Sequence, residues 1–278
     1  MRIITVQFDY DGQDDYKRLY TAFKNSCAIH ASDSELICLH LSPPIESRAI
    51  RRSFISNTIK LEAWIRALKE SSEDTLLVDC DMIMTAPIDD VWDMDFDIAY
   101  TYREEGRKSK VQATYKLVKG RKVRTGPKPH PDAIGLDCRD SRWPPINGGV
   151  MFIRPTEKSI SFIQKQLEIN NKMMNDKAFH NKWRAIYCGI NQAAFGYMLE
   201  TNLVDCNLLK LNCTEWNSCD GTWHLYEEGF TRMVHIKSAL RWYVLGKTLV
   251  PTEYKKLVNL WNKYEQGDVE VLNKRKYR

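Results

Sequence analysis

Apolar runs of strand length alternate with segments of helical periodicity through the first hundred residues of the chain. Short runs rich in Ile, Val and Leu predict strands at 2–8, 35–41, 75–78 and 97–102. Apolar residues at helical spacing predict two intervening helices, one beginning at Asp14 or Asp15 and one over residues 53–69. Strands that alternate with helices in this way predict an α/β fold with a mixed, mostly parallel sheet flanked by helices.

The second half of the chain continues this pattern with more widely spaced elements. A strand is expected at 150–153, directly after Gly148-Gly149, and a helix over about 156–174. A further helix is expected at 189–199, a short strand at 233–236 and a last helix from Pro251 to about Tyr264. The sequence contains no internal repeat, and its 278 residues fit a single large domain.

The composition is that of a globular protein. Because 43% of the residues are hydrophobic and 28% are charged, a wholly disordered chain and a collagen-like repeat are excluded. No apolar run approaches the roughly 18–20 residues of a membrane-spanning helix. The N-terminal apolar run is typical of a strand and not of a signal peptide, so we expect a cytoplasmic protein.

The eight cysteines are expected to be thiols in a reducing compartment. A zinc site remains an alternative for one group of potential ligands, Cys206, Cys213, Cys219 and His224. This alternative is disfavoured because the group lacks the short spacing between cysteines that is typical of a zinc knuckle.

The net charge of +5 is distributed unevenly along the chain. Ten basic and two acidic residues fall between Arg103 and Lys128, and four of the last five residues are basic. A basic segment on an otherwise acidic chain indicates either an anionic partner or a solvated loop. We expect residues 101–145 to form a basic lobe or loop, whose stretch 103–128 could contact DNA or another polyanion.

Two carboxylates, Asp79 and Asp81, follow the strand predicted at 75–78. Side chains two residues apart in an extended chain point to the same side, so both can bind one divalent cation. Carboxylates suit Mg²⁺ and Mn²⁺. A cation at this position can neutralise the negative charge that develops on a nucleoside diphosphate when its sugar leaves.

Three later segments add polar groups to this pair. Asn147-Gly148-Gly149 places an amide and two glycines before a predicted strand, where glycine permits a positive φ or a close approach to a ligand. Asn191-Gln192 begins a predicted helix with two amides that can bind sugar hydroxyls or cap the helix. His235-Ile236-Lys237 follows a predicted strand, and its imidazole can bind a metal while its ammonium group pairs with a phosphate.

The order of these motifs resembles that of the GT-A-fold glycosyltransferases and is most similar to the glycogenin and bacterial lipopolysaccharide galactosyltransferase group. The resemblance covers about residues 1–240. It implies a Rossmann-like sheet in a single catalytic domain, with a nucleotide-binding half at 1–100 and a donor and acceptor half at 146–250. Residues 251–278 would then be a C-terminal helix and basic tail.

The resemblance also implies roles for individual residues. The metal, Mn²⁺ or Mg²⁺, would be bound by Asp79, Asp81 and His235. The residues implied to bind the donor are Gln7, Phe8, Asp9, Lys60, Asp79, Asn147, Gly148, Gly149 and Lys237. Those implied to take part in catalysis are Asp81, Asn191 and Gln192.

Two positions depart from the pattern of the family. Asn191 stands where these enzymes often have Asp, and one residue separates His235 from Lys237 where they usually have several. An enzyme that inverts the anomeric configuration needs a carboxylate base for the acceptor hydroxyl. Glu215 is the candidate for this base, and Asp132 and Asp137 are further candidates.

The sequence therefore predicts a metal-dependent glycosyltransferase. Its donor is expected to be a nucleotide sugar, UDP-linked by preference, and its acceptor a hydroxyl group on an unidentified molecule such as modified DNA or a glycan. Two alternatives stay open: a nucleic-acid-binding module without catalysis, and a metal-dependent nucleotidyltransferase.

Overall fold

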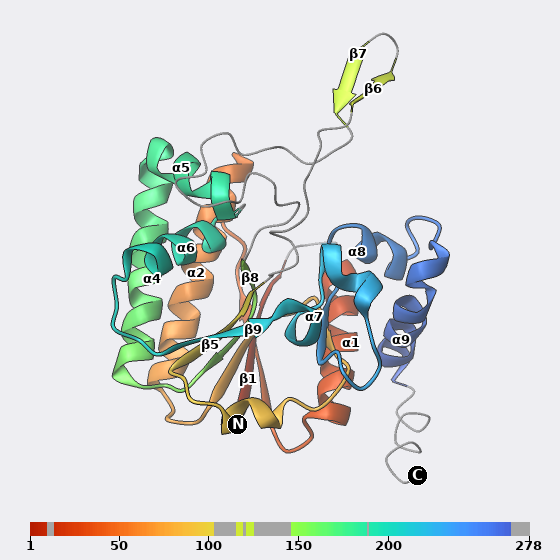
Figure 1. Ribbon diagram of the computed structural model, residues 1–278, viewed down its shortest axis with the longest axis horizontal. Coiled ribbons are helices and arrows are strands. Elements are labelled where there is room, and N and C mark those ends of the chain that lie inside the picture. The colour runs from red at the N-terminus through yellow and green to blue at the C-terminus, as the bar shows by residue number, and fades with distance from the viewer. Residues whose placement is uncertain (10–13, 103–114, 119–120, 125–145, 188, 268–278) are drawn as a thin grey trace.

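A six-stranded sheet forms the centre of the computed structural model, which describes residues 1–9, 14–102, 115–118, 121–124, 146–187 and 189–267 (Figure 1). The strand order is β2-β1-β3-β8-β5-β9. Strand β8 is antiparallel to both of its neighbours, and the other pairs are parallel. The predicted mixed, mostly parallel sheet is thus confirmed. Its strands are β1 (Arg2–Phe8), β2 (Glu35–Leu41), β3 (Thr75–Asp79), β5 (Ile98–Tyr102), β8 (Ile146–Ile153) and β9 (Leu208–Asn212).

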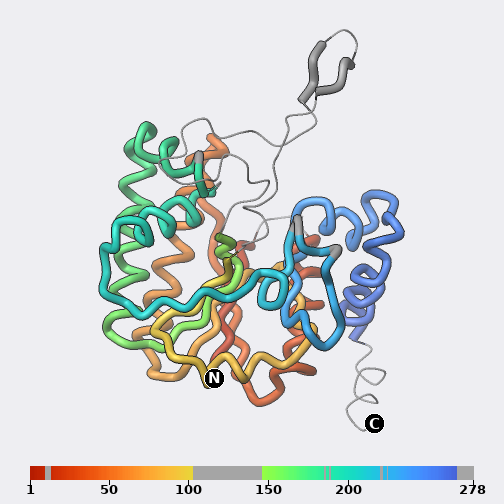
Figure 2. Tube along the Cα trace, in the orientation of Figure 1, coloured from red at the N-terminus to blue at the C-terminus, as the bar shows by residue number. Residues whose placement is uncertain are grey.

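Helices cover both faces of the sheet, as predicted. Helices α2 (Ala49–Lys69), α4 (Glu157–Asn175), α5 (Lys177–Tyr187) and α6 (Asn191–Thr201) lie on one side (Figure 1). Helices α1 (Asp14–His30), α8 (Ser238–Val244) and α9 (Lys255–Gln266) lie on the other. In Figure 2 the red tube of α1 runs beside the blue tube of α9, so the two ends of the described chain pack together.

Successive residues of the central strands enter different cores, because side chains alternate across a sheet. Ile4 and Leu77 pack in the core that contains Trp64 of α2, whereas Ile3 and Leu76 pack in the core that contains Phe23 of α1. These strands are buried on both faces. Their continuous apolar runs are typical of strands covered by helices on both sides.

A second, two-stranded sheet connects the C-terminal half of the chain to the end of β3. Strand β4 (Met82–Met84) pairs antiparallel with β10 (Met233–His235), and His235 lies opposite Met82. Short one-turn helices flank these strands, namely η1 (Asp89–Asp93), α7 (Cys213–Trp216), η2 (Asp220–Leu225) and η3 (Thr252–Tyr254). A third sheet is the hairpin of β6 (Tyr115–Val118) and β7 (Arg121–Arg124).

One prediction about the central sheet is wrong. Gly148 and Gly149 were expected to precede a strand at 150–153, but they lie inside β8. The pairing of β8 with β5 shifts in register here, because Met151 lies opposite Tyr100 while Asn147 lies opposite the next residue, Thr101. Glycine inside a strand often marks such an irregularity. Neither glycine has a positive φ, so no unusual backbone conformation requires glycine at these positions.

Several short elements were not predicted: β4, α5, β9 and α8. Helix α5 begins one residue after the C-cap of α4, so no run of turn-forming residues separates the two helices. Helix α2 begins at Ala49, four residues before the expected start. None of the helices in the described ranges is long and apolar enough to span a membrane. The location in the cell and the division into functional halves remain predictions.

Helix α6 packs against Tyr187 of α5 at a glycine. A Cβ atom added to Gly196 would come within 2.2 Å of the Tyr187 ring, which is 2% exposed and has no room to move away. We expect Gly196→Ala to destabilise the protein by about 1–3 kcal/mol, the usual cost of overpacking a core. Chemical unfolding monitored by circular dichroism measures this loss. Gly148→Ala is the control, because a Cβ there meets no atom within 4 Å; equal loss in both variants would contradict the packing argument.

Candidate functional site

Asp79, Asp81 and His235 meet at the carboxyl end of β3. Asp79 is the last residue of β3, Asp81 follows two residues later, and His235 ends β10. One potential ligand atom from each of the three lies within 4.8 Å of the others. Asp79 is half-buried, whereas Asp81 and His235 are buried. The structure therefore brings together the three residues that the sequence predicted as metal ligands.

Backbone hydrogen bonds around the β4–β10 pair fix this arrangement. The Ile236 amide donates to the carbonyl oxygen of Asp81 at 2.7 Å. The His235 amide donates to Ser218 O at 2.8 Å, and the indole nitrogen of Trp223 donates to His235 O at 3.2 Å. Because these bonds hold the backbone on both sides of His235, its imidazole stays beside the two carboxylates.

Each carboxylate of the pair also has a cationic partner. His235 Nε2 lies 3.2 Å from Asp81 Oδ1 and 3.8 Å from Asp79 Oδ2. Lys60 of α2 forms an ion pair with Asp79, and Arg241 of α8 forms one with Asp81. Burial raises the pKa of Asp81, but the charges of His235 and Arg241 and their hydrogen bonds outweigh burial and lower this pKa below its ordinary value. Asp81 is therefore ionised at neutral pH.

Arg241 is the functional candidate that the sequence analysis missed. Its guanidinium lies over the ring of Tyr16, 5.1 Å from the centroid, and donates to the Tyr16 hydroxyl at 3.1 Å. Burial lowers the pKa of Arg241, but the charges of Asp81 and Tyr16 and the hydrogen bonds to both together outweigh burial and raise this pKa. Five residues separate Arg241 from His235. The resembling family usually has several residues between its His and the following cationic residue. The spacing from His235 to Arg241 fits that pattern better than the spacing to Lys237, and this was the signal in the sequence.

A cavity of about 270 Å³ adjoins the carboxylates and is lined by the end of β1, by α1 and by α2. Val6 and Phe8 line it from one face of β1, and Lys60 lines it from α2. Gln7 points to the other face of the strand, where it is 5% exposed and its Oε1 has no hydrogen-bond partner among the described residues. Asp9 is exposed and pairs with His40, its Oδ1 lying 3.2 Å from Nδ1. Of the predicted segment 7–9, Phe8 is thus the residue that lines the cavity.

Gly149 leaves the space that the His235 ring occupies. A Cβ at this position would lie 2.6 Å from His235 Cε1 and 2.7 Å from Nδ1. The neighbouring Asn147 is 2% exposed, and its Oδ1 accepts from the Gly149 amide at 3.0 Å and from Asn217 Nδ2 at 3.1 Å. Asn147 Nδ2 in turn donates to Cys219 Sγ at 3.3 Å. In this structure the Asn147 side chain thus connects neighbouring segments by hydrogen bonds beside Asp79, Asp81 and His235. Its contact with a donor stays a prediction.

A smaller cavity of about 10 Å³ lies between β8 and the start of α6, where there is room for about one water molecule. Asn147, Gly148, Asn191 and Gln192 all line it, so the structure brings together two of the predicted motifs. Three polar atoms of its lining are buried without a hydrogen-bond partner in the described part of the chain. They are Trp64 Nε1, Gln166 Oε1 and Asn191 Oδ1.

Other predicted residues lie elsewhere. Glu215 pairs with Arg232, Oε1 to Nε at 3.4 Å, at the end of β10 opposite to His235. Arg232 and His235 are three residues apart in an extended chain, which corresponds to about 10 Å. Because Glu215 lies beside Arg232, the structure does not bring it to Asp79, Asp81 and His235. Lys237 is half-buried at the N-cap of α8 and is not among the residues that line the 270 Å³ cavity.

Some predictions fall outside the described residues. Asp132, Asp137 and most of the basic stretch 103–128 belong to this part of the chain, so their roles stay predictions. Cys206, Cys213 and Cys219 form no disulfide with any cysteine that the structure describes. Among the side chains that it describes, none of these cysteines belongs to a group of three potential metal ligands.

The residues present fit a divalent cation. Two carboxylates and one imidazole offer the oxygen and nitrogen ligands that Mn²⁺ accepts, and the ligand atoms are close enough to share one ion. The open 270 Å³ cavity beside them leaves room for further ligands from a bound molecule. The arrangement can therefore bind a cation together with an anionic ligand such as a diphosphate.

Gly149→Ala tests the position of His235. The added methyl group would displace the imidazole, and we expect the affinity for Mn²⁺ to fall about 10–100-fold, as for other changes next to metal ligands. Titration with Mn²⁺ followed by electron paramagnetic resonance measures the affinity. Gly148→Ala is again the control, since its Cβ meets no atom. Unchanged affinity in Gly149→Ala would show that His235 does not bind the ion.

Comparisons with solved structures give matches at low sequence identity. The chain matches a solved glycosyltransferase involved in glycosylation of the major capsid of PBCV-1, with a TM-score of 0.52 and 11% identity over 87% of this chain and 95% of that one. It matches apo GlyE of Streptococcus pneumoniae TIGR4 with a TM-score of 0.55 and 12% identity, over 95% of this chain and 59% of that one. The chain thus spans about three fifths of GlyE.

These identities show a shared fold and no more. A weaker match is the galactosyltransferase LgtC in complex with donor and acceptor sugar analogues, with a TM-score of 0.46 and 12% identity over 92% of this chain and 99% of that one. The comparison with curated proteins gives no match.

A family model described as nucleotide-diphospho-sugar transferase matches residues 63–250, which is more than half of the chain. The chain therefore belongs to the nucleotide-diphospho-sugar transferase family, and it is a glycosyltransferase, as predicted from its motifs.

Proposed function

We propose that this enzyme transfers a sugar from a UDP-linked donor to a hydroxyl acceptor, with Mn²⁺ or Mg²⁺ bound by Asp79, Asp81 and His235. The observation that carries the proposal is the convergence of these three side chains at the edge of the cavity lined by Val6, Phe8 and other residues. In open α/β sheets, ligands bind beyond the carboxyl ends of the strands, and this cavity lies there.

A divalent cation held by Asp79, Asp81 and His235 would neutralise charge on the diphosphate of the donor. Lys60 and Arg241, which pair with the two carboxylates in this structure, are the protein's own cations at the same place. When the bond between the anomeric carbon and the diphosphate oxygen breaks, the electron pair stays on the diphosphate. Lys60 and Arg241 stabilise that charge because they are held in position before the reaction. The acceptor oxygen then bonds to the anomeric carbon and gives its proton to the released diphosphate.

The sugar of the donor is proposed to lie toward the 10 Å³ cavity. Helix α2 connects the two cavities, since Lys60 lines the larger one and Trp64, one turn later, lines the smaller one. Lys60 Nζ lies over the Trp64 ring, 4.2 Å from its centroid. Buried polar groups are nearly always hydrogen-bonded. Trp64 Nε1, Gln166 Oε1 and Asn191 Oδ1 would find partners in a water molecule or in sugar hydroxyls.

The acceptor is proposed to be a molecule with a free hydroxyl group. We also propose that it is a polyanion, such as DNA or an acidic glycan, that contacts residues 103–128. The excess of basic residues in that stretch supports the polyanion proposal. Binding through phosphates weakens steeply with salt, because neutralised phosphates release counterions. The salt dependence of the acceptor KM therefore distinguishes a polyanion from a neutral acceptor.

A panel of nucleotides tests the donor proposal. Purified protein is heated with nucleoside diphosphates and nucleotide sugars, with and without Mn²⁺. We expect UDP and at least one UDP-sugar to raise the Tm in the presence of Mn²⁺, because a ligand at 100 times its Kd stabilises the native state by about 2.7 kcal/mol. A rise with another base would correct the donor. No rise with any diphosphate in folded protein would contradict the proposal, and release of pyrophosphate from a nucleoside triphosphate would favour nucleotidyl transfer.

Asp81→Asn tests the metal group. The amide keeps the shape of the side chain but removes its charge, so we expect the fold to persist and sugar transfer to be abolished. In a donor-cleavage assay, Mn²⁺-dependent release of UDP should fall at least ~100-fold, which corresponds to about 2.7 kcal/mol of activation free energy. Asp74→Asn is the matched control, because Asp74 directly precedes the opposite end of β3. Full transfer by Asp81→Asn would refute the mechanism.

A further inference from the structure

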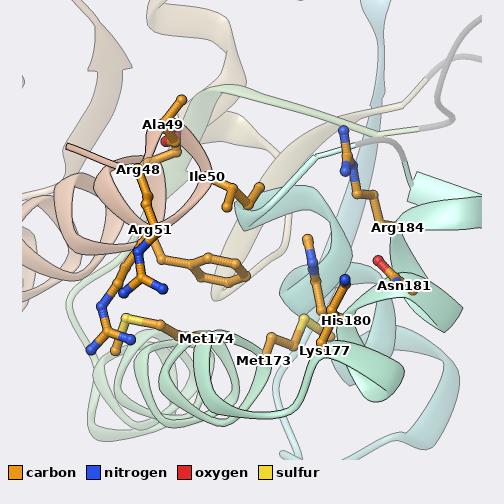
Figure 3. Close-up of a pocket in the computed structure, with 12 residues that line it drawn as sticks. Arg48, Ala49, Ile50, Arg51, Met173, Met174, Lys177, His180, Asn181 and Arg184 are labelled. Atoms are coloured by element: carbon orange, nitrogen blue, oxygen red, sulfur yellow. Dashed lines mark hydrogen bonds between the residues drawn. The ribbon is translucent and has the colours of Figure 1, made fainter. Parts of the chain in front are cut away.

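A second cavity, of about 690 Å³, lies between the start of α2, the end of α4 and α5 (Figure 3). Its size is in the range of small-molecule sites. None of the residues of the donor cavity lines it. Four of its lining residues are cationic, and among the described residues that line it none is acidic. The cations are Arg48, Arg51, Lys177 and Arg184.

The cations differ in their partners. Arg48 and Arg51 share the carboxylate of Glu46, with nitrogen–oxygen distances of 3.6 and 3.3 Å. Lys177 and Arg184 are exposed, and neither forms an ion pair with another residue in the described ranges. Figure 3 shows Arg184 on one side of Ile50 and the two arginines of α2 on the other. The positive charge of the cavity is therefore only partly compensated by the protein.

The N-terminus of α2 opens into the same cavity. Ala49 and Ile50, the first two residues of this 21-residue helix, line it. The N-cap residue Arg48 makes no side-chain capping bond, and the first turn contains no acidic residue. The first amides of a helix lack intrahelical partners and carry partial positive charge. These amides attract an anion; the Arg48 amide already donates to Glu46 Oε1 at 2.9 Å, and the Arg48 side chain does not cap the amides that follow.

A buried imidazole provides an independent observation. His180 is 3% exposed and lines the cavity, and its Nε2 has no hydrogen-bond partner in the described part of the chain. In Figure 3 its ring extends from α5 toward the space between Ile50 and Arg184. Burial and the charge of Arg184 lower the pKa of His180. A buried nitrogen without a partner is uncommon in native proteins, and a ligand in this cavity would provide one.

The remaining wall of the cavity is apolar. Phe54 packs edge-on against His180, with ring centroids 4.7 Å apart, and Met173 and Met174 of α4 lie beside them. An inorganic anion would leave this wall without contacts. A ligand with both an anionic group and an apolar portion would use the whole cavity.

We propose that this cavity is a second ligand site that binds an organic phosphate, with the phosphate at Arg184, Lys177 and the α2 N-terminus and the organic portion against Phe54, Met173 and Met174. A phosphate offers more acceptor oxygens than a carboxylate and so matches several converging donors. The site is separate from the donor cavity. Helix α2 contributes Ser56 and Lys60 to the donor cavity, and to this one Ala49, Ile50, Arg51, Ser53 and Phe54. The inference therefore does not depend on the proposed function.

Calorimetric titration with phenyl phosphate tests the proposal, in EDTA and without nucleotide. We expect saturable binding that is tighter than that of inorganic phosphate, because the ring adds apolar contacts, and no saturable binding of benzyl alcohol. Arg184→Gln and Lys177→Gln should each raise the Kd of phenyl phosphate about tenfold or more, the usual effect of losing a charged hydrogen bond. Both residues are exposed, so the variants should fold.

Two controls make the test specific. Lys182→Gln removes the same charge from an exposed position of α5 that does not line the cavity, and it should leave the Kd unchanged. Arg241→Gln changes the donor site and should also leave it unchanged. Loss of binding in Arg241→Gln, with normal binding in the two cavity variants, would place the anion in the donor site and overturn the proposal. Absence of phenyl phosphate binding to the wild-type protein would overturn it as well. Neither result depends on whether UDP binds.

Discussion

The repulsion between Asp79 and Asp81 is the constraint around which this structure is arranged. Two carboxylates this close destabilise each other unless positive charge or hydrogen-bond donors compensate for them. Three elements that are distant in sequence supply this compensation: Lys60 from α2, His235 from β10 and Arg241 from α8. A divalent cation would provide the same compensation between the two carboxylates and so compete with these partners. Lys60, His235 and Arg241 are therefore already in position to stabilise the negative charge of a diphosphate.

The central sheet makes this convergence possible. Strand β3 ends at Asp79, and the β4–β10 pair places His235 beside the carboxylates through backbone hydrogen bonds. Strand β8 contributes space, because Gly149 lies against the imidazole where any larger residue would displace it. The irregular pairing of β8 with β5 lets this backbone segment approach the ring. Gly149 thus acts by the absence of a side chain, without an unusual backbone conformation.

Helix α2 connects three cavities of different character. Its first turn borders the cationic cavity, its middle carries Lys60 at the donor cavity, and Trp64 one turn later closes the small polar cavity. Both larger cavities expose positive charge, but they differ in what surrounds it. In the donor cavity the cations are paired with carboxylates that suit a metal, whereas Lys177 and Arg184 have no such partner among the described residues. Anionic ligands could therefore occupy both sites at once.

Local sequence determined much of this protein. The strands 2–8, 35–41 and 75–78 and the long helices follow from apolar periodicity. Asp79 and Asp81 could be identified because they come after an apolar strand, and His235 because the order of the motifs resembles that of the GT-A family. Contacts between distant segments decided the rest. Nothing near Gly149 in sequence reveals that it packs on His235. The spacing from His235 points to Arg241, but the pairing of Arg241 with Asp81 depends on the packing of α8. Glu215 is a carboxylate in a plausible segment, yet α7 places it beside Arg232, at the end of β10 opposite to His235. Sequence specifies which chemical groups are present and which local structure they adopt, whereas register and packing, which depend on partners far along the chain, decide which groups meet.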